Sequence, residues 1–134
     1  MSWHHICALL VSFGMGACGE KPPVDWMYSE FNSLLSICPE SGQKIERKSS
    51  TASLTYTWSC PYPKNFDEWL SEFEKNHLTI RGWSKGKTPS PYTWHTYCNS
   101  QQKVVMRVVK VEAKKAGDDD RLWISIRFPG SECS

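Results

Sequence analysis

The chain has 134 residues, which is the size of one globular domain, since single hydrophobic cores usually form from about 100 to 200 residues. Hydrophobic residues make up 40% of the chain and charged residues 22%, a balance that supports a folded core and excludes intrinsic disorder. Sixteen Lys and Arg against 14 Asp and Glu leave a net charge of +2, so nucleic acid is not expected as a partner.

The N-terminal segment differs in composition from the rest of the chain. Residues 1–17 contain no Lys, Arg, Asp or Glu, and residues 6–15 form a nearly unbroken apolar run. A helix needs about 20 apolar residues to span a bilayer, so this shorter run is typical of the apolar core of a cleaved export signal.

A more specific interpretation comes from the residues that follow the apolar run. The segment Met15-Gly16-Ala17-Cys18 resembles the lipobox of bacterial lipoproteins, where cleavage occurs before a cysteine that carries diacylglycerol. The resemblance implies a signal peptide over 1–17, a lipidated Cys18 and a stable lipid anchor, palmitate among its acyl chains. Gly19 in place of Asp resembles the sorting pattern of outer-membrane lipoproteins, which implies the outer membrane, facing the periplasm. The alternatives to a lipoprotein signal are an ordinary secretory signal and a buried N-terminal helix.

The remaining chain divides into a tether and a domain. Residues 18–23 end in Pro22-Pro23, which favours an extended polyproline geometry and predicts a short spacer. Residues 24–134 are then a single periplasmic α+β domain.

The cysteines predict disulfide bonds. Cleavage removes Cys7 and lipidation uses Cys18, so an even number of cysteines remains in an exported chain, which predicts two disulfides. Four cysteines allow three pairings, of which we favour Cys38–Cys60 with Cys98–Cys133 because the second pair fixes the C-terminus to a strand. No two of these cysteines are as close in sequence as structural zinc sites require, so we expect no metal. The four are Cys38, Cys60, Cys98 and Cys133.

The first half of the domain contains two helical patterns and one strand. Apolar residues at helical spacing predict a helix from Val24 that ends before Cys38-Pro39. Residues 41–53 are polar and predict a loop, and the alternation over 54–60 predicts a strand. A second helix is expected after Asn65, with Glu68 as the reciprocal capping residue and Asn76 as the stop.

The second half predicts strands only. Segments rich in β-branched and aromatic residues cover 78–84, 92–98, 103–113 and 121–128. The connections between them are short, so neighbouring strands are expected to be antiparallel. The sequence therefore predicts an α+β fold, in the order α-β-α-β-β-β-β, with a mainly antiparallel sheet of about five strands and two helices packed on one face.

The alternation in these strands also predicts an uncovered face. If the helices cover the aliphatic side, the opposite side carries aromatic and basic residues of the kind enriched at recognition surfaces. An alternative is that the aromatic residues only stabilise the sheet as cross-strand pairs. The predicted partner-binding residues are Trp83, Trp123, His95, Tyr97, Arg81 and Arg127.

No catalytic motif is present in the sequence. His77 and His95 lie in no nucleophile, metalloprotease or phosphate-loop pattern, so we expect no catalytic residue and no cofactor. The acidic run Asp118-Asp119-Asp120 follows Gly117 and predicts a solvated turn rather than a calcium loop. The protein is therefore expected to act by binding and not as an enzyme.

The expected partner is a protein in the periplasm. In size and architecture the chain looks like the small lipoproteins that inhibit lysozymes or neutralise secreted toxins, which implies an inhibitor or immunity protein. The aromatic and basic patch, or the loop 81–91, would occlude the active cleft of the partner, and the membrane would be contacted by the N-terminal lipid only. The alternative is a structural accessory lipoprotein, such as a pilotin or a secretion-apparatus component.

Overall fold

The computed structural model describes residues 20–37 and 44–133. The predicted signal peptide, Cys18 and Cys38 lie outside the described residues, so these remain predictions. None of the described helices is both long enough and apolar enough to cross a bilayer.

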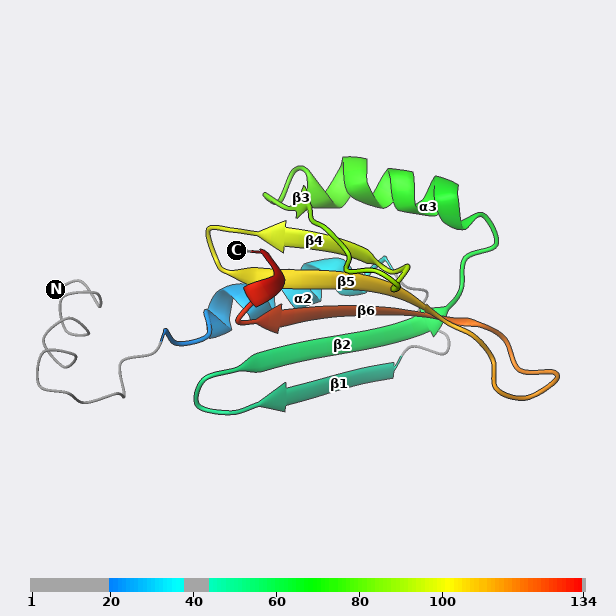
Figure 1. Cartoon of the computed structure of the whole chain (residues 1–134), viewed down its shortest axis with the longest axis horizontal. Coiled ribbons are helices and arrows are strands. Elements are labelled where there is room, and N and C mark those ends of the chain that lie inside the picture. The colour runs from blue at the N-terminus through cyan, green and yellow to red at the C-terminus, as the bar shows by residue number, and fades with distance from the viewer. Residues whose placement is uncertain (1–19, 38–43, 134) are drawn as a thin grey trace, which may run out of the picture.

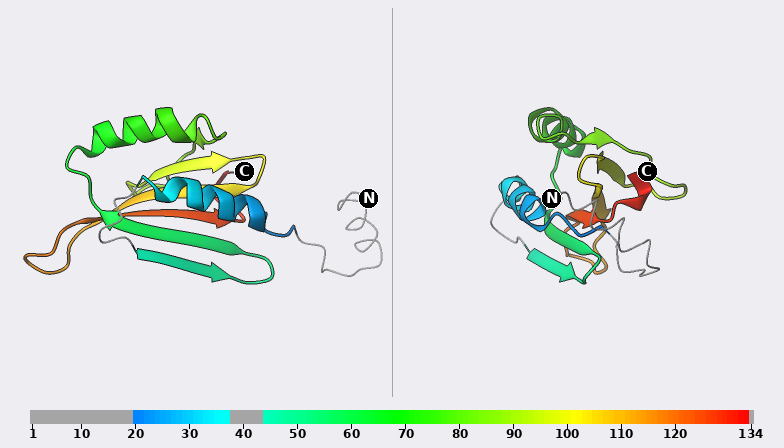
Figure 2. Two further views of the ribbon diagram at one scale, coloured as in Figure 1. Left: turned by 180° about the vertical axis from the view of Figure 1, so that it is seen from behind. Right: turned by 90° about the vertical axis from the view of Figure 1, so that its left-hand side faces the viewer.

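The described residues form one antiparallel sheet with two helices on one of its faces (Figures 1 and 2), which confirms the predicted α+β class. The sheet has six strands rather than about five, in the order β1-β2-β6-β5-β4-β3. In chain order the elements are α2 (Val24–Leu35), β1 (Lys44–Ser49), β2 (Leu54–Pro61), α3 (Phe66–Phe73), the π-helical turn η1 (Glu74–Leu78), β3 (Ser84–Lys85), β4 (His95–Asn99), β5 (Val104–Val111), β6 (Arg121–Phe128) and the 3₁₀ turn η2 (Ser131–Cys133).

The pairing register gives the sheet two different faces. Trp58 lies opposite Ile124 and Met106 lies opposite Ile126, and these side chains belong to the core beneath the helices. The alternate residues, such as Trp123, lie on the outer face, which neither helix covers. This alternation is the expected consequence of the two-residue period of a strand.

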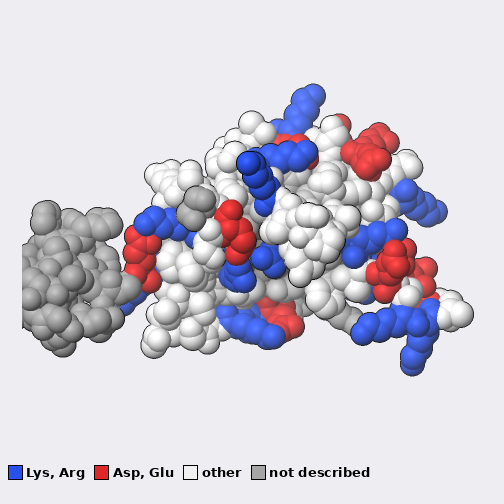
Figure 3. Space-filling model, viewed as in Figure 1, with Lys and Arg blue, Asp and Glu red and all other residues white. Residues whose placement is uncertain are grey.

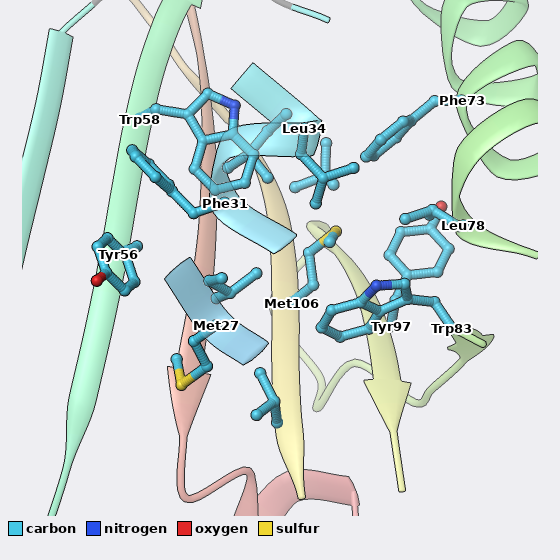
Figure 4. Close-up of a cluster of buried hydrophobic side chains, with 14 of the residues drawn as sticks. Met27, Phe31, Leu34, Tyr56, Trp58, Phe73, Leu78, Trp83, Tyr97 and Met106 are labelled. Carbon is cyan, nitrogen blue, oxygen red and sulfur yellow. The ribbon is translucent and has the colours of Figure 1, made fainter. Parts of the chain in front are cut away.

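Helix α2 packs through apolar residues at the predicted helical spacing, although Val24 and Tyr28, which were expected in the same stripe, are exposed. Met27, Phe31 and Leu34 are buried against the sheet (Figure 4). The ring of Phe31 stacks on Tyr56 at 4.7 Å and meets Trp58 edge-on at 5.4 Å. Such aromatic contacts add about 0.5–1.5 kcal/mol per pair beyond the burial of their area.

Helix α3 begins after Asn65 as predicted, but two details of the prediction are wrong. The side chain of Asn65 makes no capping hydrogen bond, and the helix does not stop at Asn76. It continues as η1 to Leu78, which is buried in the same core as Phe73.

The predicted strand over 78–84 is also wrong. Residues 78–82 form the end of η1 and a turn, and the backbone N–H of Trp83 donates to the carbonyl of Leu78 at 2.9 Å. Gly82 has a φ of +85°, which glycine adopts readily and which ends the helical segment. Of residues 78–85, Ser84 and Lys85 form strand β3, which pairs with β4.

The predicted loop over 41–53 contains strand β1. Its residues pair with β2 through a hairpin in which Ser50 N–H donates to the Ser53 carbonyl at 2.9 Å. Residues 45–49 of β1 are all exposed, so the strand has no alternating apolar pattern to reveal it. Polar and charged residues are common on such edge strands, where they oppose unwanted pairing with other chains.

Candidate functional site

The six predicted partner-binding residues do not share one face. Trp83 and Tyr97 are only 5% and 2% exposed, so their predicted position on the outer face is wrong (Figure 4). His95 is also on the helix-covered side, because His95 lies opposite Val108 and Tyr97 lies opposite Met106 in the register with β5. In strand β4, His95 and Tyr97 therefore point to the helix-covered face, opposite to the prediction.

Trp83 and Arg81 are used inside the fold. The indole N–H of Trp83 donates to Glu30 at 2.8 Å, and Nε of Arg81 donates to the same carboxylate at 2.9 Å. Glu30 lies on α2 and is 2% exposed. A buried carboxylate needs such donors, since an unpaired buried charge is strongly unfavourable.

Tyr97 and His95 have polar and aromatic partners beneath α3. The hydroxyl of Tyr97 donates to Glu74 at 2.7 Å, and burial together with this bond raises the pKa of Tyr97. The imidazole of His95 lies 5.7 Å from the ring of Phe66, and partial burial lowers the pKa of His95 below its usual value.

Trp123 and Arg127 lie on the outer face, as predicted. Arg127 is ion-paired with Glu132, which also pairs with Arg107 at 3.5 Å. Trp123 is 45% exposed, and its neighbours across the strands are Ser59 and Val109.

Two hollows adjoin Trp123. One, of about 580 Å³, lies towards the connection between β5 and β6 and includes Arg121. The other, of about 320 Å³, lies towards β1 and includes Ile45 and Thr57. We call Trp123 with the residues of these two hollows the Trp123 surface.

The charges on this side of the molecule are mixed. Figure 3 shows Lys and Arg side chains interspersed with Asp and Glu side chains over the face that the helices leave uncovered. Close to Trp123, the guanidinium of Arg121 donates to the hydroxyl of Ser59 at 3.1 Å. The surface therefore combines an exposed indole with polar neighbours, and no single sign of charge dominates it.

The C-terminus is attached to the outer face by a disulfide. The sulfurs of Cys98 and Cys133 lie at bonding distance, with their Cα atoms 5.6 Å apart, which agrees with the favoured pairing. Cys60 is buried and disulfide-bonded. Its expected partner, Cys38, is outside the described residues, so that pairing remains a prediction.

A second hollow region was not predicted from the sequence. A cleft of about 420 Å³ lies beside the end of β5 that extends past β4. Three separate segments line it, two of which supply its aromatic side chains, and no local pattern in the sequence could have brought them together. We call it the aromatic cleft, and its principal residues are Tyr62, Phe66, Tyr92, Trp94, His95 and Lys110.

The acidic run contributes to the structure of a turn. Oδ1 of Asp120 accepts a hydrogen bond from the backbone N–H of Ala113 at 2.9 Å, and Oδ2 lies 3.6 Å from Nζ of Lys110. Within the described ranges, no three His, Cys, Asp or Glu side chains are grouped so that they could hold a metal ion.

Comparisons with protein-family models, with curated proteins and with solved structures found no match to the chain.

Proposed function

We propose that this chain is a small bacterial envelope lipoprotein, anchored by lipid on Cys18, that binds a protein partner non-covalently in the periplasm. The partner would be a secreted toxin or a lysozyme-like enzyme, which the chain inhibits or neutralises. The observation that carries the proposal is the 45% exposed indole of Trp123, set between two hollows on the sheet face that neither α2 nor α3 covers.

This arrangement suits steric inhibition. Tryptophan and arginine are enriched among the residues that contribute most to protein interfaces, because each gives a large contact area from a stiff planar group. Trp123 would insert into a pocket of the partner, with Arg121 beside it and the connection 112–120 at the rim. Attachment to the membrane would raise the effective concentration of the inhibitor where the partner arrives.

The lipid anchor is tested by intact-mass analysis of the native product. The proposal expects a chain that begins at Cys18 and carries diacylglycerol. A product that retains residues 1–17, or that begins elsewhere without fatty acid, would contradict it.

The binding role is tested with a single variant of the full chain. We expect the wild type to inhibit lysis of a cell-wall suspension by lysozyme, or to neutralise a toxin encoded beside it, and Trp123→Ala to lose this effect while remaining folded. Tyr28→Ala is the matched control, because Tyr28 is an exposed aromatic residue on α2, away from the Trp123 surface. Equal inhibition by the wild type and Trp123→Ala would show that the Trp123 surface does not bind the partner.

The edge of the sheet supports a second candidate, the structural accessory role. Within the described part of the chain β1 pairs only with β2, so its other edge is available for a partner strand. The two candidates differ in genetic context. A toxin gene beside this one favours the inhibitor, whereas a cluster of secretion genes favours the accessory.

A further inference from the structure

We propose that the aromatic cleft is a glycan-binding site, which takes sugar rings between Tyr92 on one wall and Tyr62 on the other. The cleft and the Trp123 surface share no lining residue, so this inference is independent of the proposed function.

One wall of the cleft is formed by Tyr92 and Trp94, whose rings stack on each other. Tyr92 stacks on Trp94 with ring centroids 4.2 Å apart and an angle of 22° between the planes. The guanidinium of Arg107 lies 4.9 Å from the ring of Trp94 and is itself paired with Glu132. Tyr92 is 56% exposed, so it offers ring surface that is already supported from below. Such preorganisation lowers the entropy lost on binding.

The other wall comes from the start of α3. Tyr62 stacks on Phe66 at 5.0 Å with an interplanar angle of 12°, and Phe66 contacts His95. Val108 and Val109 of β5 also line the cleft. All these groups are on or next to regular elements, so the cleft has a defined shape.

The cleft offers both donors and acceptors. Nζ of Lys110 lies 4.9 Å from the ring of Tyr62 and 3.6 Å from Oδ2 of Asp120, and the phenol hydroxyls of Tyr62 and Tyr92 can both donate and accept. Burial lowers the pKa of His95, which favours the neutral imidazole that can both donate and accept. An oxygen-rich ligand would satisfy these groups.

These features select one class of ligand. The charges around the cleft are mixed, because Lys110 and Lys85 are accompanied by carboxylates, so the cleft selects no ion of one sign. The carboxylates are Asp67, Glu74 and Asp120. A purely apolar ligand would leave the donors unsatisfied. A sugar ring presents C–H groups that suit the electron-rich faces of aromatic rings, together with hydroxyls that suit donors and acceptors. The volume of about 420 Å³ is within the range of small-ligand sites.

The test is isothermal titration calorimetry of the full chain in mild detergent. The probes are chitotetraose, cellotetraose and maltotetraose, each at millimolar concentration. We expect at least one of them to bind. We expect Tyr92→Ala to weaken that binding about tenfold or more and Tyr92→Trp to retain it. Tyr28→Ala is a closely matched control, because Tyr28 is 57% exposed and lies on α2 outside the cleft.

Three outcomes would overturn the assignment. These are no heat of binding with any of the three probes, an unchanged affinity in folded Tyr92→Ala, and an equal loss in Tyr92→Ala and Tyr28→Ala. Trp123→Ala should bind the glycan normally. A failure of this inference is therefore distinguishable from a failure of the proposed function.

Discussion

The indole N–H of Trp83 donates a 2.8 Å hydrogen bond to the carboxylate of Glu30, which joins the segment directly before β3 to the middle of α2. Both residues are buried, and Arg81 completes the pairing of the carboxylate. This relationship makes Trp83 a structural residue, so a variant at this position reports on folding and not on partner binding.

Replacing Trp83 by Phe should lower the stability of the protein. The substitution keeps most of the ring and removes the donor, and hydrogen bonds to charged groups contribute about 1.5–3 kcal/mol. We expect the free energy of unfolding in urea to fall by this amount. Trp123→Phe is the control, since Trp123 is exposed and its replacement should change stability by less than about 0.5 kcal/mol. Similar losses in both variants would contradict the role given to Glu30.

Removing the disulfide between Cys98 and Cys133 should also be destabilising. The bond joins residues 35 positions apart, and loops of this size are expected to contribute about 2–4 kcal/mol by restricting the unfolded chain. The double variant Cys98→Ala and Cys133→Ala should show this loss in chemical denaturation under non-reducing conditions. Ser100→Ala, in an exposed turn beside β4, serves as the control. An unchanged midpoint in the double variant would show that the bond does not form.

Stability should depend on pH through His95. Burial is the largest cause that lowers the pKa of His95 in the folded protein, so the unfolded state binds the proton more readily. The contribution of His95 is therefore complete above the unfolded pKa of about 6.5 and is lost as the pH falls below it. Urea denaturation at a series of pH values between 8 and 5 should show this decline. In His95→Gln the decline should be shallower, and an identical profile in the variant would contradict the assignment.

Gly130 should not tolerate a side chain. A Cβ at this position would lie 2.7 Å from the backbone nitrogen of Val105, while the N–H of Gly130 donates to the carbonyl of Lys103 at 2.7 Å. Because the obstruction is backbone, Gly130→Ala should cost about 1–3 kcal/mol in a thermal or urea unfolding experiment. A Cβ added at Gly117 would have no neighbouring heavy atom within 4 Å. Its φ of +94° still disfavours alanine, but because nothing obstructs the side chain, Gly117→Ala should cost less than Gly130→Ala. A larger loss of stability in Gly117→Ala than in Gly130→Ala would contradict the close packing at Gly130.

The elements that the sequence predicts well are those with a regular apolar period. Helix α2 and strands β2, β5 and β6 each bury one face against the core, and their boundaries agree closely with the predicted segments. Strand β1 was not predicted because its residues 45–49 are all exposed, so the pairing with β2 produces no alternation of apolar and polar residues.

The errors at the candidate site have a related cause. The sequence around Leu78 and Trp83 is as rich in apolar and aromatic residues as a strand. In the structure, however, Leu78 is buried at the end of a helical segment and Trp83 is buried after the turn that follows it. The facing of His95 and Tyr97 depends on where β4 begins, and a shift of one residue reverses every side chain. Trp123 was placed correctly because β6 is regular from its first to its last residue.

If Cys18 carries the proposed lipid, the direction of strand β5 determines which end of the described domain is nearer the attachment point. Glu20 forms an ion pair with Lys103, just before β5 begins, whereas Lys110 and the connection 112–120 lie at the far end of the same strand (Figure 1). Eight residues of strand span roughly 25 Å. With that lipid, the aromatic cleft and the tip of the connection 112–120 would lie at the end of the sheet opposite the attachment point, about one strand length from it.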